Sequence, residues 1–161
     1  MNRVDVNKIS NEEWLAIEKE MFIEAYQVAI MALVDMGDSE GALNFLRPHM
    51  RMSGNAFAIN MKRVFDIQGN DLDKIGDLCF LYEKFYHHGL EEIERTPEMI
   101  IRVGGTQCPW QSSPKEGCIG GHEMVLNGVC ESINPEYRCR FTQMIPKGDL
   151  ICSYVIEKKK K

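Results

Sequence analysis

The stretch from Gly104 to His122 constrains the fold most, because it separates a helix-like half of the chain from a half rich in alternating strands. It contains five glycines and two prolines, which interrupt both helices and sheets. It also contains two cysteines, a tryptophan and a terminal histidine. The surrounding elements must hold such a loop in place, and loops held in this way often contain binding and catalytic groups. We therefore take this loop as the candidate functional site.

The first half of the sequence has the spacing of amphipathic helices. Ser10 and Glu13 form a capping box, and apolar residues then recur every three or four positions. This pattern predicts a long helix from about residue 11 to residue 36, ended by Gly37.

Two further helices are expected before the sheet. Asp38 and Ser39 begin the second, and Pro48 predicts an interruption after about residue 46, because proline lacks a backbone donor. Helicity resumes to about residue 67. A third helix is predicted over residues 71–86, and histidines 87 and 88 at its end favour the negative end of the helix dipole.

The second half has strand periodicity. Residues 90–95 and 99–103, separated by a Thr-Pro-Glu turn, predict two strands, although the first of these segments could equally be a short helical turn. Residues 119–132 after the loop predict a helix. The alternating residues 137–145 and 150–156 predict an antiparallel hairpin. The fold class is therefore α+β: about three N-terminal helices, one of them long, pack on a small antiparallel sheet formed by the C-terminal half.

The 161 residues suit a single domain, with a helical half over 10–88, a sheet half over 89–157 and a lysine tail over 158–161. A net charge of −5 argues against nucleic acid as a partner. The polar start of the chain predicts no leader sequence, and no apolar run has the ~20 residues of a membrane span. We expect a cytoplasmic protein that does not bind membranes, with reduced cysteines.

Cysteine chemistry is the first hypothesis for the loop. Cys118 and His122 are four residues apart, which places them on one helix face if a helix begins at Cys118. A helix N-terminus lowers the pKa of a cysteine and favours the thiolate. His122 could then serve as the base for Cys118 or for Cys108.

Metal binding is the second hypothesis. Cys108, Cys118 and His122, joined by Cys130 or an acidic residue, are ligands that zinc or iron would accept. The chain has no Cys-x2-Cys pair, so a zinc site would require ligands that only folding brings together. A structural loop with unreactive thiols is the third reading.

The cysteines of the predicted hairpin are not expected to share a ligand. A four-residue turn pairs Gln143 with Cys152 and Cys139 with Ile156, which separates the two sulfurs by roughly 13 Å along the ladder. Trp110 could form the floor of a pocket or fill the core, and the sequence leaves both readings open.

Short motifs resemble the L-2-amino-thiazoline-4-carboxylic acid hydrolase-like family. They are residues 103–110, Cys130-Glu131, residues 133–135 and residues 145–154. The hairpin pattern Gly148-Asp149-x-x-Cys152 also resembles the end of vinyl-reductase-type domains, which bind small aromatic or tetrapyrrole-like ligands. The Glu-x2-Cys that precedes this hairpin in zinc-binding members is replaced here by Phe141 and Met144.

The resemblance implies a pocket between helices and sheet and a hydrolase that opens a cyclic C=N substrate similar to 2-amino-thiazoline-4-carboxylate. Cys108 or Cys118 would attack the amidine carbon, or a metal that they hold would activate water. His122 would transfer the proton, and Glu123 or Glu131 would bind an amino group.

The alternative function is a non-enzymatic sensor or carrier domain of vinyl-reductase type that binds a small molecule, cofactor or metal. Both functions predict a small-molecule partner. A third possibility is an interaction subunit whose long first helix mediates assembly. A homo-oligomer is also left open.

Overall fold

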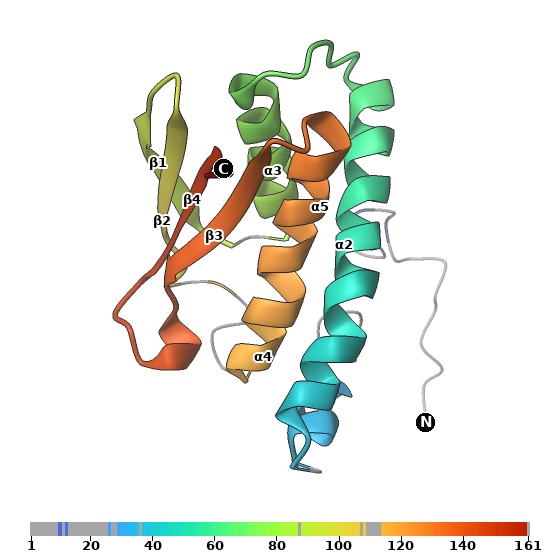
Figure 1. Ribbon diagram of the computed structural model, residues 1–161, viewed down its shortest axis with the longest axis vertical. Coiled ribbons are helices and arrows are strands. Elements are labelled where there is room, and N and C mark those ends of the chain that lie inside the picture. The colour runs from blue at the N-terminus through green and yellow to red at the C-terminus, as the bar shows by residue number, and fades with distance from the viewer. Residues whose placement is uncertain are drawn as a thin grey trace.

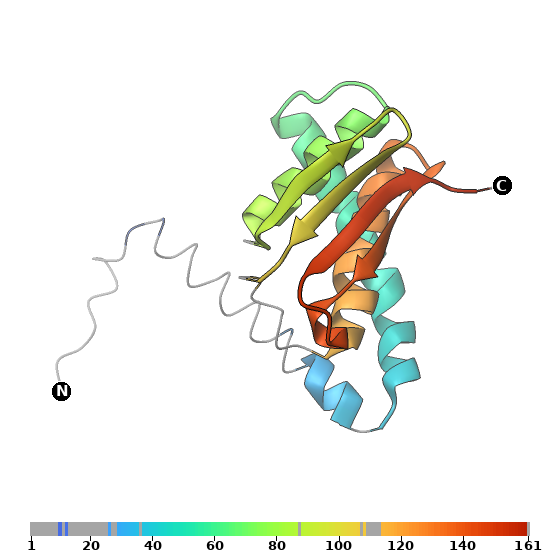
Figure 2. The same ribbon diagram turned by 90° about the vertical axis from the view of Figure 1, so that its left-hand side faces the viewer.

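The computed structural model describes residues 10, 12, 26, 29–35, 37–86, 88–106, 108 and 114–160. Helices cover one face of a four-stranded antiparallel sheet, which confirms the predicted α+β class (Figures 1 and 2). In Figure 1, helix α5 (Glu123–Ile133) lies between the sheet and helix α2 (Ser39–Val64), and helix α3 (Leu72–Phe85) lies beside it. The single-domain division of the chain stays a prediction.

The sheet has the strand order β1-β2-β4-β3. Strands β1 (Leu90–Arg95) and β2 (Met99–Gly104) form the first predicted hairpin. Strands β3 (Tyr137–Gln143) and β4 (Cys152–Lys158) form the second, and β4 lies against β2 at the centre of the sheet. The four strands expected from sequence periodicity are therefore confirmed.

The register of the second hairpin differs in part from the prediction. Cys139 pairs with Ile156 as expected, but Gln143 pairs with Ser153 and not with Cys152, because the ladder shifts between Phe141 and Gln143. A bulge of this kind adds a residue to one strand. The connection also contains a short 3-10 helix, Ile145–Lys147, so it is longer than the four-residue turn that the sequence suggested.

The predicted break at Pro48 is wrong, because α2 continues through this residue. Pro48 lies on the exposed side of the helix. We attribute the continuity to the packing of α2 along α5, which outweighs one missing backbone hydrogen bond. The helix begins where predicted: Asp38 Oδ1 accepts from the Gly41 N–H at 2.8 Å.

Two glycines allow α2 and α5 to approach closely. A Cβ atom at Gly54 would lie 2.0 Å from the Val125 carbonyl oxygen, and one at Gly128 would lie 2.1 Å from the Arg51 carbonyl oxygen. Both neighbours are backbone atoms, so any larger residue would force the two helices apart. This contact fixes the position of α5 against the outer helix.

The third predicted helix is confirmed as α3, with Asp71 as its N-cap: Oδ1 accepts from the Lys74 N–H at 3.0 Å. Its inner face contains Cys79, which is fully buried. Of the two histidines placed at its end, His87 lies outside the described residues. His88 is fully buried and contacts His122, so the predicted role at the helix dipole is wrong.

The helix predicted over 119–132 is composed of three segments. One turn of α-helix, α4 (Lys115–Gly117), leads into a π-helical turn, Cys118–His122, and then into α5. Most of α5 is buried between α2 and the sheet. The core of the molecule lies between these helices and the inward residues of the strands, including Ile75, Leu126, Val129, Tyr154 and Ile156.

Candidate functional site

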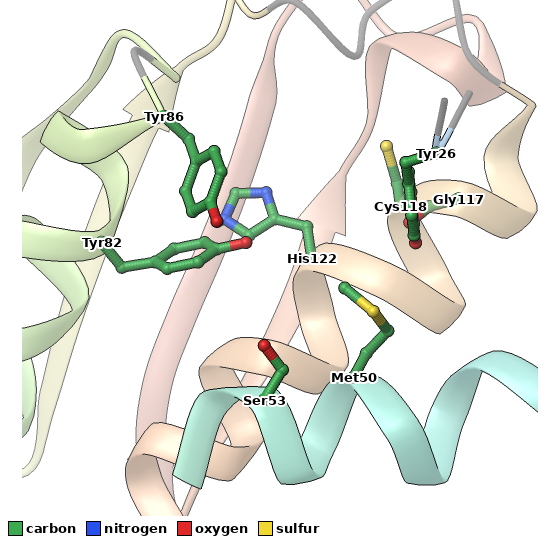
Figure 3. A pocket seen from close by; sticks show the side chains of 8 residues that line it. All are labelled: Tyr26, Met50, Ser53, Tyr82, Tyr86, Gly117, Cys118 and His122. Carbon is green, nitrogen blue, oxygen red and sulfur yellow. The ribbon is translucent and has the colours of Figure 1, made fainter. Parts of the chain in front are cut away.

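Two pockets flank the π-helical turn, and Cys118 and His122 line both of them. The first pocket lies between α2, α3 and the turn (Figure 3). Its lining residues are Tyr26, Met50, Ser53, Tyr82, Tyr86, Gly117, Cys118 and His122. The second pocket lies toward the sheet and is lined by His88, Leu90, Gly105, Cys108, Cys118, His122, Phe141, Pro146 and Cys152.

The π-helical turn depends on two consecutive glycines. A Cβ atom at Gly121 would lie 2.1 Å from the Tyr26 hydroxyl oxygen, and one at Gly120 would lie 3.0 Å from the Leu46 Cβ atom. The glycines therefore let Tyr26 and α2 pack directly against the turn. Single π-turns within helices frequently mark functional sites, and this one presents Cys118 and His122 to the pockets.

His122 is enclosed by aromatic rings. Its ring centroid lies 4.1 Å from that of His88, 5.1 Å from that of Phe141 and 5.6 Å from that of Tyr82. Its Nε2 atom is buried and has no hydrogen-bond partner among the described residues. Burial lowers the pKa of His122 to about 3, because a charged imidazolium would lose its hydration without a compensating partner. The imidazole is therefore neutral at physiological pH.

Cys118 does not have the lowered pKa that the sequence suggested. Burial, with a smaller contribution from Cys108, raises the pKa of the Cys118 thiol to about 12. The predicted dipole effect fails because the residue continues the α4 turn into a buried π-turn and does not begin a helix. Burial also raises the pKa of Cys152. Cys108 lines the second pocket together with Cys118 and Cys152.

The predicted metal site is wrong for the described residues, in which no group of three or more His, Cys, Asp or Glu side chains could hold a metal ion. Cys108, Cys118 and His122 share the second pocket without forming a ligand set. Cys130 does not line either pocket; it is fully buried, and its thiol shares a hydrogen bond with the Cys79 thiol. The predicted zinc or iron therefore has no site within this part of the chain.

The two acidic candidates have structural contacts. A Glu123 carboxylate oxygen accepts from the Phe141 N–H at 3.1 Å, which joins α5 to β3. Glu131 forms ion pairs with Arg51 at 3.4 Å and Lys159 at 3.9 Å. Neither residue lines the two pockets around Cys118. Trp110 lies outside the described residues.

Sequence reasoning missed the tyrosines that complete the first pocket. Figure 3 shows the hydroxyl ends of Tyr82 and Tyr86 directed toward the His122 imidazole, with Tyr26 on the other side near Cys118. The apolar spacing of the third helix does not distinguish a tyrosine that fills the core from one whose hydroxyl reaches a pocket. The signal that the sequence does contain is the spacing of these two tyrosines, which lie four residues apart near a helix end that is followed by histidines.

A buried polar network behind the pockets was also missed. The Arg102 Nε atom lies 2.8 Å from a Glu83 carboxylate oxygen, and the Tyr154 hydroxyl donates to the other oxygen. Burial raises the pKa of Glu83 to about 7, and the guanidinium of Arg102 opposes this shift. Arg102 is only 2 % exposed and also donates to the Leu90 carbonyl oxygen at 2.9 Å. This network joins α3 to the sheet.

Within the described part of the chain, no helix is both long enough and apolar enough to cross a membrane. No protein-family model and no curated protein sequence matches the chain. Its fold is similar to that of trafficking protein particle complex subunit 3 from Naegleria fowleri, which was solved covalently bound to palmitic acid. The TM-score is 0.70 at 10% sequence identity, and the match covers 90% of this chain and 97% of the other.

This structural neighbour contradicts both predicted functions, the hydrolase of a cyclic C=N substrate and the vinyl-reductase-type sensor or carrier. The similarity is to a subunit of a trafficking complex. The site geometry also argues against the predicted hydrolase. Burial keeps the Cys118 thiol protonated, and a histidine with a pKa of about 3 is a poor base at neutral pH. The resemblance to the hydrolase-like family stays a prediction, as do the homo-oligomer and the exclusion of nucleic acid.

Proposed function

We propose that this chain is a non-catalytic subunit of a protein assembly that acts in membrane trafficking. The proposal is supported by the fold, which matches a trafficking-complex subunit over nearly the full length of both chains. A cytoplasmic location at the surface of a trafficking organelle belongs to the same proposal. A subunit of this kind needs a surface for a protein partner, and α2 offers one.

The outer face of α2 has an apolar stripe formed by Phe45, Met52 and Ile59, which are 58%, 68% and 63% exposed. These residues are seven positions apart, so they lie within about 20° of one line along the helix. The stripe is about 21 Å long at 1.5 Å per residue. Large apolar side chains grouped in this way on a surface favour an interface with another protein.

The stripe suits a helix from the partner, because a line of apolar side chains along one helix can pack against the apolar face of an amphipathic second helix. The opposite face of α2 is already packed on α5. We therefore infer that the partner contributes an amphipathic helix and that its apolar side chains cover the stripe.

Covalent acylation is a weaker candidate. The similar subunit was solved with palmitic acid covalently attached, and an acyl thioester needs a nucleophilic cysteine. Burial raises the pKa values of both Cys118 and Cys152, so the fraction of thiolate, which is the reactive form, is low at both positions. The described pockets therefore favour a subunit that does not depend on acylation of either thiol.

The test compares two double variants in cells of the source organism. Met52→Asp with Ile59→Asp places two charges on the stripe. Asn44→Asp with Asn60→Asp is the matched control, because it adds the same charge at exposed positions on the same helix but off the stripe. Each tagged protein is cross-linked through a photoreactive residue at position 56, within the stripe, and purified.

We expect the parent chain and the control to cross-link to defined proteins of a trafficking complex and to elute with them at high mass. The stripe variant should lose at least 90% of the cross-linked product while its circular dichroism spectrum is retained. A parent chain that elutes as a lone monomer, or a stripe variant that keeps its partners, would refute the proposal.

A further inference from the structure

The first pocket has a cavity volume of about 40 Å³. One water needs about 10–15 Å³, so the cavity accepts roughly three atoms of a ligand. The pocket has an open side, and apolar surface predominates in its lining. This geometry suits a molecule with a small polar end and a longer apolar part that extends toward the mouth.

The polar end of such a ligand would meet His122. The Nε2 atom of this residue is buried and has no hydrogen-bond partner among the described residues. A buried polar atom that is left unpaired destabilises the folded state, so a ligand that pairs with it gains binding free energy. The hydroxyl ends of Tyr82 and Tyr86 point to the same ring (Figure 3). A group placed beside the imidazole would therefore find both a nitrogen and phenolic oxygens within the pocket.

None of the described residues that line the pocket carries a formal charge. None of them is Lys, Arg, Asp or Glu, and burial keeps the pKa of His122 at about 3, so its imidazole is neutral. A carboxylate or phosphate inserted among these residues would lose its hydration without gaining a cation from them, which is costly. An alcohol can donate one hydrogen bond and accept others, and its desolvation is compensated by a single neutral nitrogen and a phenol.

We propose that this pocket binds the hydroxyl end of a neutral alcohol with an apolar body, and that His122 is its hydrogen-bonding partner. The apolar body would pack against Met50 and the rings of Tyr82 and Tyr86. This inference concerns the interior of the fold and does not depend on the assembly role of α2. If experiment refutes either the ligand-binding inference or the assembly role of α2, the other proposal is unaffected.

The experiment uses 1-octanol as the probe and octanoate at pH 8 as a charged probe with the same chain length. Binding to the full chain is measured by isothermal titration calorimetry and by the nitrogen NMR signals of the histidine side chains. The variant His122→Phe removes the ring nitrogens and keeps an aromatic ring. The matched control is His49→Phe, at an exposed position on α2.

We expect saturable binding of 1-octanol, with octanoate at least tenfold weaker. His122→Phe should weaken octanol binding about tenfold, and His49→Phe should leave it unchanged. In the parent protein, octanol should shift the His122 nitrogen signals and octanoate should not, which tests the contact even if the variant folds poorly. Equal binding of octanoate, non-saturable uptake of octanol, or unshifted His122 signals would overturn the inference.

Discussion

The neutral, buried imidazole of His122 predicts a specific loss of stability in acid. The pKa of this residue is about 3 in the folded chain and about 6.5 in an unfolded chain. Between these values the unfolded state binds a proton that the folded state does not. The free energy of unfolding therefore falls as pH decreases from 6.5 toward 3, and this contribution is fully present only above pH 6.5.

The size of the effect follows from the two pKa values. A pH of 5 lies about 1.5 units below the pKa of the unfolded histidine, and each unit corresponds to 1.36 kcal/mol. The titration of His122 therefore lowers the free energy of unfolding by about 2 kcal/mol at pH 5 relative to pH 8. Glu83 has the opposite effect, because its pKa is raised to about 7. Its contribution to the free energy of unfolding is therefore lost as pH rises from 4.5 to 7. A comparison of variants at one site cancels this second effect.

The assay is urea denaturation at pH 8 and pH 5 for the parent chain, His122→Phe and His49→Phe. The phenylalanine at position 122 cannot titrate and still packs against Tyr82 and Phe141. We expect the loss of stability between the two pH values to be about 2 kcal/mol smaller in His122→Phe than in the other two proteins. An equal loss in all three, or an NMR titration of His122 near pH 6.5, would refute the reasoning.

Three further predictions concern the rest of the fold. Gly128→Ala should lower the free energy of unfolding by about 1–3 kcal/mol, because the added methyl would meet the Arg51 carbonyl oxygen at 2.1 Å. The control Asn60→Ala, at an exposed position, should change the free energy of unfolding by less than about 0.5 kcal/mol. Equal urea midpoints for the two variants would contradict the predicted clash. Arg102→Met should cost about 3–5 kcal/mol because it leaves the Glu83 carboxyl buried without its partner, whereas Arg102→Met with Glu83→Gln should cost less; additive losses in a double-mutant cycle would show that the pair is not coupled. All six cysteines are buried and none of them forms a disulfide, so a thiol reagent at pH 8 should modify the native protein at least tenfold more slowly than the urea-unfolded protein. Rapid labelling of Cys118, detected by mass spectrometry, would contradict its raised pKa.

The local elements of this protein could be predicted because each depends on neighbours in the sequence. Asp71 caps α3 with its own side chain, and the alternation in β3 reflects one buried and one more exposed face of that strand. The same reasoning found the loop that holds Cys108, Cys118 and His122 near one another. It failed at Pro48, where packing on α5 outweighs local helix propensity, and at the β3 bulge, which no local pattern marks.

The character of the site was decided by the tertiary structure. The sequence shows Cys118 and His122 four residues apart, but only the packing of α2, α3 and the sheet determines how much water reaches them. Burial raises the pKa of the thiol and lowers that of the imidazole, so the pair that resembled a nucleophile and its base is neutral. The tyrosines opposite His122 come from a helix distant in sequence, and their place in the pocket follows from the fold. Thus the main helices and strands were determined by local sequence. The protonation and the contacts of the site residues depend on how the fold excludes solvent.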